Sequence, residues 1–169
     1  MVRMGLDFGL ESTTVCLKRK FRWLFIVPSV SAEGISSLPP SRGARPGISF
    51  KEIQVEHLNE TIFYPGKPDW KPVELVLYDL KKNSHPVFRW LQNIYNPSNG
   101  AFATPLENGF IKSEAYLELY DGCGTVLEKW VFENIWPNSI DFGELDMANS
   151  EIVTCSLTLR YARAYLQGQ

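Results

Sequence analysis

The two histidines, His57 and His85, are the only side chains of this chain that ordinarily exchange a proton near neutral pH. His57 lies in an alternating apolar and polar stretch typical of a strand, and His85 precedes a proline at a predicted helix start. Neither has a neighbour at the spacing of metal ligands or of an acid–base pair. The sequence also lacks a glycine-rich phosphate loop, a nucleophile elbow and an HExxH helix. We therefore expect no enzymatic activity, no cofactor and no metal.

Three cysteines, Cys16, Cys123 and Cys155, are widely spaced and form no CxxC pair, which excludes the familiar zinc and thioredoxin patterns. Cys155 falls in an apolar alternation and is expected in the core. Cys123 lies in the predicted turn 121–124, where an exposed thiol either cross-links two chains or stays inert. Free thiols favour assembly in a reducing compartment.

Charged clusters provide two further candidate sites. The carboxylates of residues 141–146 (DFGELD) lack the spacing and closing glutamate of an EF-hand, so the evidence for a calcium site is weak. The basic cluster Lys18, Arg19, Lys20 and Arg22 resembles a nucleic-acid contact, but the pI of about 5.7 and the lack of a recognition motif argue against tight, sequence-specific binding. The alternative is that these cations flank a buried strand and keep it soluble.

The elements that position these residues must come from one domain. A chain of 169 residues with 44% hydrophobic and 21% charged residues is typical of a soluble globular protein, and it buries enough surface to fold without a metal or disulfide. Residues 1–106 carry 13 Lys and Arg against 9 Asp and Glu, and residues 107–169 carry 4 against 10. This asymmetry either orients subunits that associate head to tail or is a scattered surface charge.

Residues 17–34 (LKRKFRWLFIVPSVSAEG) have the order of a secretory signal, with cations, an apolar run and then small residues. Sixteen residues precede the stretch, however, and the apolar run of residues 23–30 is far shorter than the ~20 residues that span a bilayer. Its aromatic and β-branched residues favour a buried strand. We expect residues 21–30 to form the first core strand, residues 1–19 to form an arm, and no membrane anchor.

Alternating residues predict the remaining strands, and one stretch predicts a helix. The predicted strands are 50–58, 61–64, 73–79, 111–120, 125–132 and 153–161; the first two form a hairpin, with Ile53, Val55 and His57 on a half-buried face. The helix begins after Ser84 as N-cap, ends near Asn96, and places Val87, Trp90, Leu91 and Ile94 on one face. Together they predict a mostly β fold: an antiparallel sandwich or split barrel of about seven strands with one flanking helix, over residues 20–169, with a long loop at 31–49.

The last third of the chain carries a family resemblance. A hairpin leads into Trp136 and Pro137, then Asp141-Phe142-Gly143-Glu144-Leu145-Asp146, then Ser150-Glu151-Ile152 and an alternating strand to Leu159 and Tyr161. This order resembles the tail tube proteins of contractile long-tailed bacteriophages, in the superfamily that includes type VI secretion tubes. The residue matches are Trp136, Pro137, Gly143, Glu151, Ile152 and Tyr161. Trp136 and Pro137 are expected to hold a corner of the core.

The resemblance implies a structural virion protein that forms homo-hexameric rings. The rings would stack into the inner tail tube, which conducts double-stranded DNA and is driven into the host when the sheath contracts. Sheath, baseplate and tail terminator proteins would be its partners, and it would assemble in the host cytoplasm. Two alternatives stay open: a baseplate tube initiator or secretion-system tube subunit of the same fold, and a monomeric ligand-binding β-sandwich that uses exposed aromatics such as Tyr116 and Tyr120.

Within that interpretation, some residues are candidates for specific contacts. Ring-to-ring contact is assigned to the long loop, through Ile35, Leu38, Arg42 and Arg45. The lumen of a DNA conduit should not bind phosphates tightly, so a polar or acidic strand face suits it. The candidate faces are Glu114 with Glu118, and Thr154 with Ser156 and Thr158. Each is equally consistent with an ordinary solvated strand face.

Overall fold

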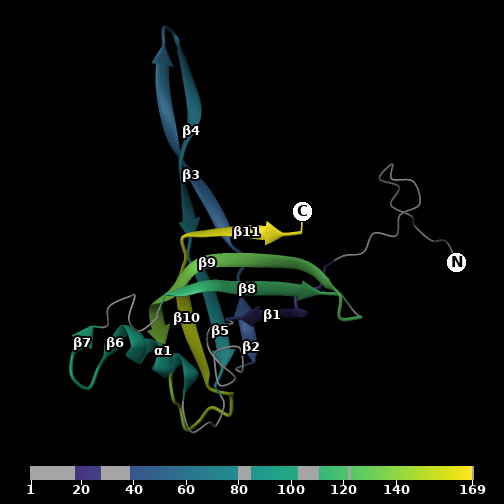
Figure 1. The fold of residues 1–169 in the computed structure, drawn as a ribbon, viewed down its shortest axis with the longest axis vertical. Helices are drawn as coiled ribbons and strands as arrows, with labels where there is room; N and C mark the ends of the chain where they lie inside the picture. Colours follow the sequence, from purple (N-terminus) through teal and green to yellow (C-terminus); the bar gives the residue numbers. More distant parts are fainter. Residues whose placement is uncertain (1–17, 28–38, 80–84, 103–110, 122, 169) are drawn as a thin grey trace, which may run out of the picture.

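A single strand of 16 residues, β9 (Val126–Asp141), runs through both halves of the protein (Figure 1). The structure is a computed structural model, and it describes residues 18–27, 39–79, 85–102, 111–121 and 123–168. The first part of β9 pairs with β8 (Lys112–Tyr120) and β11 (Arg163–Gln167), and its last part pairs with β10 (Thr154–Arg160). Asn134, with φ of 52°, lies where the partners change. β9 therefore belongs to two sheets.

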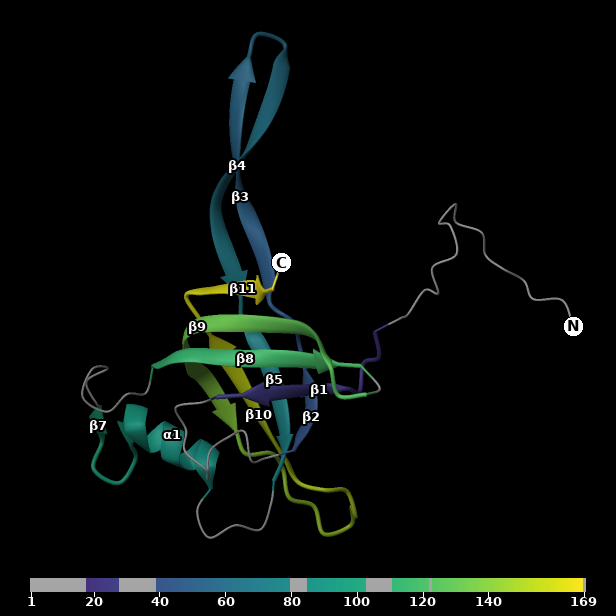
Figure 2. The ribbon, with the colours of Figure 1, turned by 45° about the vertical axis from the view of Figure 1, so that its right-hand side comes forward.

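All strand pairs are antiparallel, in the order β1-β8-β9-β10-β5-β2, and β11 joins at β9. We call β1 (Trp23–Ile26), β8, β11 and the first part of β9 the first sheet. The second sheet contains the last part of β9 with β10, β5 (Val73–Tyr78) and β2 (Pro40–Gly43). The strands of the two sheets cross steeply in Figures 1 and 2. The predicted antiparallel, mostly β sandwich with a single helix is confirmed.

The core lies between the two sheets because every second residue of each strand points inward. Phe132 is fully buried and contacts the rings of Phe25 and Tyr161, with centroids 5.9 and 5.1 Å away. The buried apolar side chains come from both sheets: Phe25, Ala115, Leu117, Phe132 and Ile135 from the first, and Val73, Leu75, Leu77, Cys155, Leu157 and Leu159 from the second. The period-two patterns of β5, β8 and β10 thus identify the core correctly, Cys155 included.

The helix α1 (Pro86–Ile94) packs its apolar stripe against this core, and Val87 and Trp90 are buried as predicted. Its N-cap is His85, whose Nδ1 accepts a hydrogen bond from the backbone N–H of Phe88 at 3.4 Å. Ser84, the predicted N-cap, lies outside the described residues. Two short strands, β6 (Tyr95–Asn96) and β7 (Ala101–Phe102), follow the helix and were not predicted. In the described ranges no helix has the length and apolar character to cross a bilayer.

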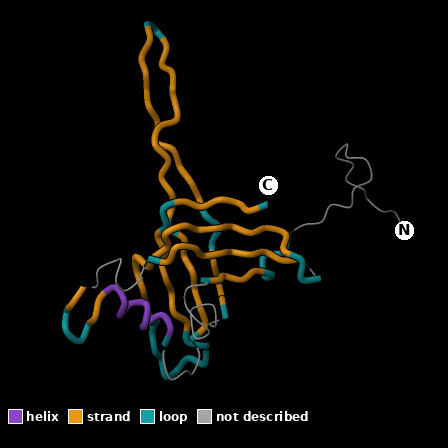
Figure 3. Tube along the Cα trace, viewed as in Figure 1, coloured by secondary structure: helices purple, strands orange, loops and turns teal. Residues whose placement is uncertain are grey.

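A long hairpin of β3 (Gly47–His57) and β4 (Glu60–Lys71) projects from the body, as the trace in Figure 3 shows. Its turn is at Leu58 and Asn59, and Leu58 has φ of 53°. β4 ends one residue before Pro72, after which β5 enters the second sheet. The hairpin was predicted, but its half-burial is wrong, since nearly every residue of both strands is exposed. Nothing in the described chain packs over its outer part.

Other boundaries also differ from the predictions. The first strand was predicted over residues 21–30, and the structure has it at Trp23–Ile26. Residues 28–30 lie outside the described chain. The predicted loop 31–49 is wrong in its second half, because β2 occupies Pro40–Gly43 and β3 begins at Gly47. β2 forms because its backbone completes the edge of β5. The terminal strand β11 was missed. Residues 1–17, which hold most of the predicted arm, are outside the described chain.

Candidate assembly surfaces

The hairpin exposes more apolar surface than a free protein usually does. Ile53 pairs with Tyr64 and Val55 pairs with Ile62, so these four side chains form one apolar face, which we call the hairpin face. Each of them is 42–52% exposed. Nearer the body, Ile48 and Phe50 are exposed as well. Contiguous apolar surface of this kind marks an interaction site or an aggregation hazard.

Free strand edges surround the body. Among the described strands, β1, β11 and β2 each have one paired neighbour, and the hairpin has two free edges. β1 and β2 have only four residues each, and β11 has five. Short edges limit unwanted pairing, but the hairpin strands have 11 and 12 residues and offer a long template. Among the described strands, the hairpin therefore offers the longest unpaired edges.

The outward face of the first sheet holds one candidate lumen set. Glu114 is exposed, whereas Glu118 is only 9% exposed, so it is largely covered within a single chain. Lys129 lies 3.2 Å from Glu118, and Nζ of Lys129 lies 4.2 Å from the centre of the Tyr116 ring. The hydroxyls of Tyr116 and Tyr120 donate to Glu114 and Glu118, respectively. These acids are therefore paired with donors on the same face.

The hydrogen bond to Glu118, reinforced by burial and by the carboxylate charge, raises the pKa of Tyr120 to about 12. The hydrogen bond to Glu114 likewise raises the pKa of Tyr116. Both phenols therefore stay protonated and keep donating at neutral pH. Arg163 forms a forked pair with Glu133 on the same face, donating through Nε and Nη2. The face is polar, with its charges largely compensated.

The second candidate set lies on a different sheet. Ser156 is exposed, and Thr154 and Thr158 are half-buried, on the outward face of β10. Their neighbours in β5 are Tyr78, Val76 and Glu74. The fold therefore brings Thr154, Ser156 and Thr158 together but keeps them apart from Glu114 and Glu118. Each face stays a prediction for the lumen.

The predicted stacking loop is divided by the structure. Ile35 and Leu38 lie outside the described residues. Arg42 lies in β2, exposed, with Nη2 3.8 Å from Glu74, and Arg45 follows the strand. Nη1 of Arg45 lies 3.4 Å from Oε1 of Glu128, a side chain that is only 4% exposed. The stacking role of these residues stays a prediction.

Glu128 is the main charged group that the sequence did not identify. It points inward from β9 and accepts hydrogen bonds from Nζ of Lys18 and from Nε1 of Trp130. Burial alone would raise the pKa of Glu128, but the bonds from Lys18 and Trp130 and the charges of Lys18 and Arg45 outweigh it and lower the pKa. The cluster joins three segments that are far apart in sequence, and no local pattern predicts it.

A groove of about 460 Å³ lies beside this cluster, between the edges of β1 and β2. Its rim carries the cations Lys18, Arg19, Lys20, Arg42 and Arg45, and Trp23, Leu117 and Leu119 contribute apolar surface. We call it the basic groove. The Trp23 ring lies so close to Gly43 that a Cβ there would be 2.7 Å from Cη2 of Trp23. Gly43 therefore lets the ring cross from β1 to β2.

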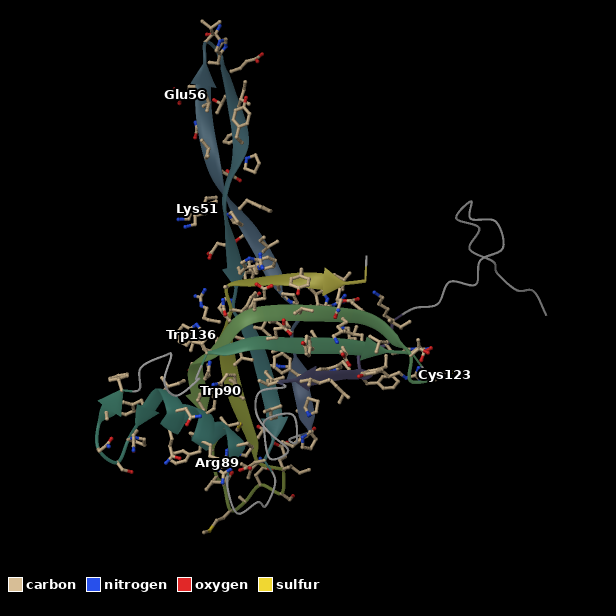
Figure 4. All side chains as sticks on the ribbon, viewed as in Figure 1. Lys51, Glu56, Arg89, Trp90, Cys123 and Trp136 are labelled. Atoms are coloured by element: carbon tan, nitrogen blue, oxygen red, sulfur yellow. The ribbon has the colours of Figure 1, made fainter. Side chains whose placement is uncertain are left out.

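The residues that carried the resemblance occupy the second sheet and its end. Trp136 (labelled in Figure 4) is half-buried and Pro137 is buried, just after the bend at Asn134. Tyr161 is buried, and its ring centroid lies 5.8 Å from that of Trp70. Glu151 and Ile152 are exposed. The role of Trp136 and Pro137 in holding a corner of the core stays a prediction.

The segment 141–152 connects β9 to β10, and we call it the acidic loop. Gly143 lies near its start. It has φ of 80°, and a Cβ there would lie 2.4 Å from the carbonyl oxygen of Thr154. Side-chain oxygens of Asp141, Asp146 and Asn149 accept hydrogen bonds of 2.9–3.0 Å from backbone N–H groups two residues ahead. Such Asx turns order a loop without burying it. Residues 141–152 are exposed throughout.

The other candidate reactive residues do not converge. His57 is exposed at the hairpin end, and His85 caps α1, 3.2 Å from Asp79. Cys123 is exposed at the β8–β9 turn (Figure 4) and Cys155 is buried. Across the residues that the structure describes, no three His, Cys, Asp or Glu side chains gather in a way that could hold a metal ion.

The fold is shared with chains from structures of a tube-terminating cap, a contractile injection system and a tail tube. No protein-family model and no curated protein matches this sequence. A chain in the structure of the anti-feeding prophage tube-terminating cap has a TM-score of 0.74 at 17% identity, over 98% of this chain and 100% of that one. A chain of the PVC sheath–tube complex has a TM-score of 0.70 at 18% identity, over 90% and 93%. A chain of the SPP1 tail tube has a TM-score of 0.53 at 12% identity, over 88% and 76%. The chain therefore shares its fold with these cap, sheath–tube and tail tube chains.

Proposed function

We propose that this protein is a structural subunit of the inner tube of a phage-like contractile machine. Copies would form a hexameric ring, and rings would stack into a tube surrounded by a sheath and mounted on a baseplate. The proposal places the protein in the tail of the particle, assembled in the host cytoplasm. Passage of double-stranded DNA through the lumen is part of the same proposal.

The observation that carries the proposal is the exposed hairpin face. A two-stranded hairpin of this length is marginally stable alone in water, and here it also exposes Ile53, Val55, Ile62 and Tyr64. If another copy covers the hairpin face and pairs with the hairpin edges, the hairpin is stabilised and its apolar side chains are buried. In a head-to-tail ring every such contact is repeated, and the ring closes without free edges. The tube and cap chains with this fold supply the precedent.

A second candidate function is a ring that terminates a tube instead of extending it. The likeness over 98% of this chain to a chain of the anti-feeding prophage cap structure favours it. A terminator would form rings without continuous stacks. The monomeric ligand-binding alternative is less favoured, because the hydroxyls of Tyr116 and Tyr120 are already bonded to carboxylates of their own face.

Electron microscopy of the purified protein over a concentration series tests these proposals. Hollow tubes support the tube subunit, and single or paired rings at every concentration support the terminator. A variant with Val55→Lys and Ile62→Lys should unfold like the wild type, because both side chains are exposed, but should not assemble. Gln54→Lys, on the opposite face of β3, is the matched control. Monomers of the wild type at all concentrations would contradict both ring proposals.

A further inference from the structure

We propose that the basic groove binds the acidic loop of a second copy of this chain. The inference rests on the proposed self-assembly and assigns one of its contacts. The basic groove and the acidic loop lie at different places on the same molecule, and their shapes and charges are complementary. One surface carries exposed cations beside apolar side chains, and the other carries exposed apolar side chains beside acids.

The groove combines a cationic rim with an apolar floor. Arg19 and Lys20 are exposed on the rim, and no ion pair within the described chain engages either of them. Lys18 and Arg45, by contrast, are held by Glu128. The rim therefore has cations available beyond those that its own buried carboxylate neutralises. Trp23 and Leu119, both partly buried, form apolar surface beside them.

The acidic loop presents the complementary pattern. Glu144, Leu145, Asp146 and Met147 alternate acid and apolar side chains, and Leu145 and Met147 are 85% and 107% exposed. Isolated exposed apolar residues are normal, but two at the tip of an ordered loop next to two acids form a candidate contact. The apolar pair matches the groove floor, and the acids match Arg19 and Lys20 on the rim.

The loop is held in place well enough to act as a ligand. Phe142, at its start, packs against His85 and Phe88, with ring centroids 5.4 and 6.2 Å apart. Gly143 then fixes the entry of the loop against Thr154. An ordered loop loses less conformational entropy on binding than a flexible one does.

The loop of one copy binding the groove of another is a heterologous contact. The loop extends beyond the ends of β9 and β10, away from the hairpin, while the groove lies at the β1 and β2 edges (Figure 2). Such a contact repeats from copy to copy, as a ring or a stack requires. It also uses the charge asymmetry between the two parts of the sequence.

Carbodiimide cross-linking tests the contact directly. Unlabelled and ¹⁵N-labelled protein are mixed, allowed to assemble, treated with the reagent and analysed by mass spectrometry. We expect amide links from Lys20 to Glu144 or Asp146 that join one light and one heavy chain. If Lys20 forms no mixed-isotope link with the loop, the proposal is wrong.

Charge reversal provides a second readout. Arg19→Glu with Lys20→Glu, or Glu144→Lys with Asp146→Lys, should each raise the concentration needed for assembly roughly tenfold. The chain carrying all four substitutions should assemble again, because the complementarity is restored. Arg89→Glu with Arg160→Glu reverses the same number of charges at exposed residues outside both the groove and the hairpin, and should change assembly little. If the charge-reversal variants all assemble like the wild type, the groove contact is wrong. The proposed tube still stands in that case, provided that the hairpin variant with Val55→Lys and Ile62→Lys does not assemble.

Discussion

The hydroxyl of Tyr161 donates a hydrogen bond of 2.8 Å to the backbone carbonyl oxygen of Lys71, a residue 90 positions earlier in the chain. Lys71 is the last residue of β4, so the bond joins the end of β10 to the foot of the hairpin. The ring of Tyr161 also packs on Trp70. The direction of the projecting hairpin is thus fixed at its base by the second sheet.

Tyr161→Phe should lower the free energy of unfolding by about 1 kcal/mol, because it leaves the Lys71 carbonyl without this donor. Urea unfolding followed by fluorescence measures the change. Tyr165→Phe, at a phenol that is 44% exposed, is the control and should stay within about 0.5 kcal/mol of the wild type. Equal effects of the two substitutions would show that the bond to Lys71 contributes nothing to stability.

Gly143→Ala should destabilise the protein by at least about 2 kcal/mol, since it adds both the strain of φ 80° and a contact of 2.4 Å with the Thr154 carbonyl oxygen. Gly124→Ala is the matched control. Gly124 has φ of 90° but nothing within 4 Å of its Cβ position, so it carries only the backbone strain. Thermal or urea unfolding gives the loss of stability in each variant, and the difference between the two losses is the cost of the steric contact with Thr154. A Gly143 variant no less stable than the Gly124 variant would contradict the close packing of the acidic loop.

Glu128→Gln should cost about 1–3 kcal/mol at neutral pH, because Lys18 and Trp130 then donate to a neutral amide instead of a carboxylate, or lose these bonds. The pKa of Glu128 is lowered below 4.5 in the folded protein, so its contribution is complete above that value and is lost as the pH falls through the folded pKa. The difference in unfolding free energy between wild type and variant should therefore narrow as the pH falls from 4.5 through the lowered pKa of Glu128. Urea titrations from pH 3 to 7 measure it, with exposed Glu114→Gln as control. If the difference in unfolding free energy between wild type and variant did not change with pH, the assigned role of the ionised Glu128 carboxylate would be wrong.

Cys123 and Cys155 should differ strongly in reactivity. Burial, with smaller effects from Asp79 and Asp141, raises the pKa of Cys155 to about 11, while Cys123 is exposed. Brief treatment of native protein with iodoacetamide at pH 8 should alkylate Cys123, and Cys155 should react only after unfolding in urea. Peptide mass spectrometry distinguishes the sites. Rapid native alkylation of Cys155 would place it outside the core, and only monomer on a non-reducing gel of assembled protein would count against cross-linking through Cys123.

The local sequence was sufficient for much of the fold. The alternations through Leu117 and Leu159 predict β8 and β10 with the correct inward faces, because successive side chains of a strand point to opposite faces of the sheet. The stripe through Val87 and Trp90 predicts the covered face of α1 for the same reason, at helical period. The residues around Trp136 and Gly143 carried the resemblance to tail tube proteins, and the structure has the fold of the chains from the cap and sheath–tube structures.

Other features depend on residues that meet only in three dimensions. The alternation through Ile53 and Val55 looks like a half-buried strand, but periodicity does not say whether the same chain or another copy covers the apolar face. The cluster at Glu128 depends on Lys18, 110 residues away, and on Arg45, which follows an edge strand that completes β5. The sequence by itself thus determined which residues alternate. The tertiary structure decided which alternating face stays uncovered and which distant charges meet, because both depend on long-range packing.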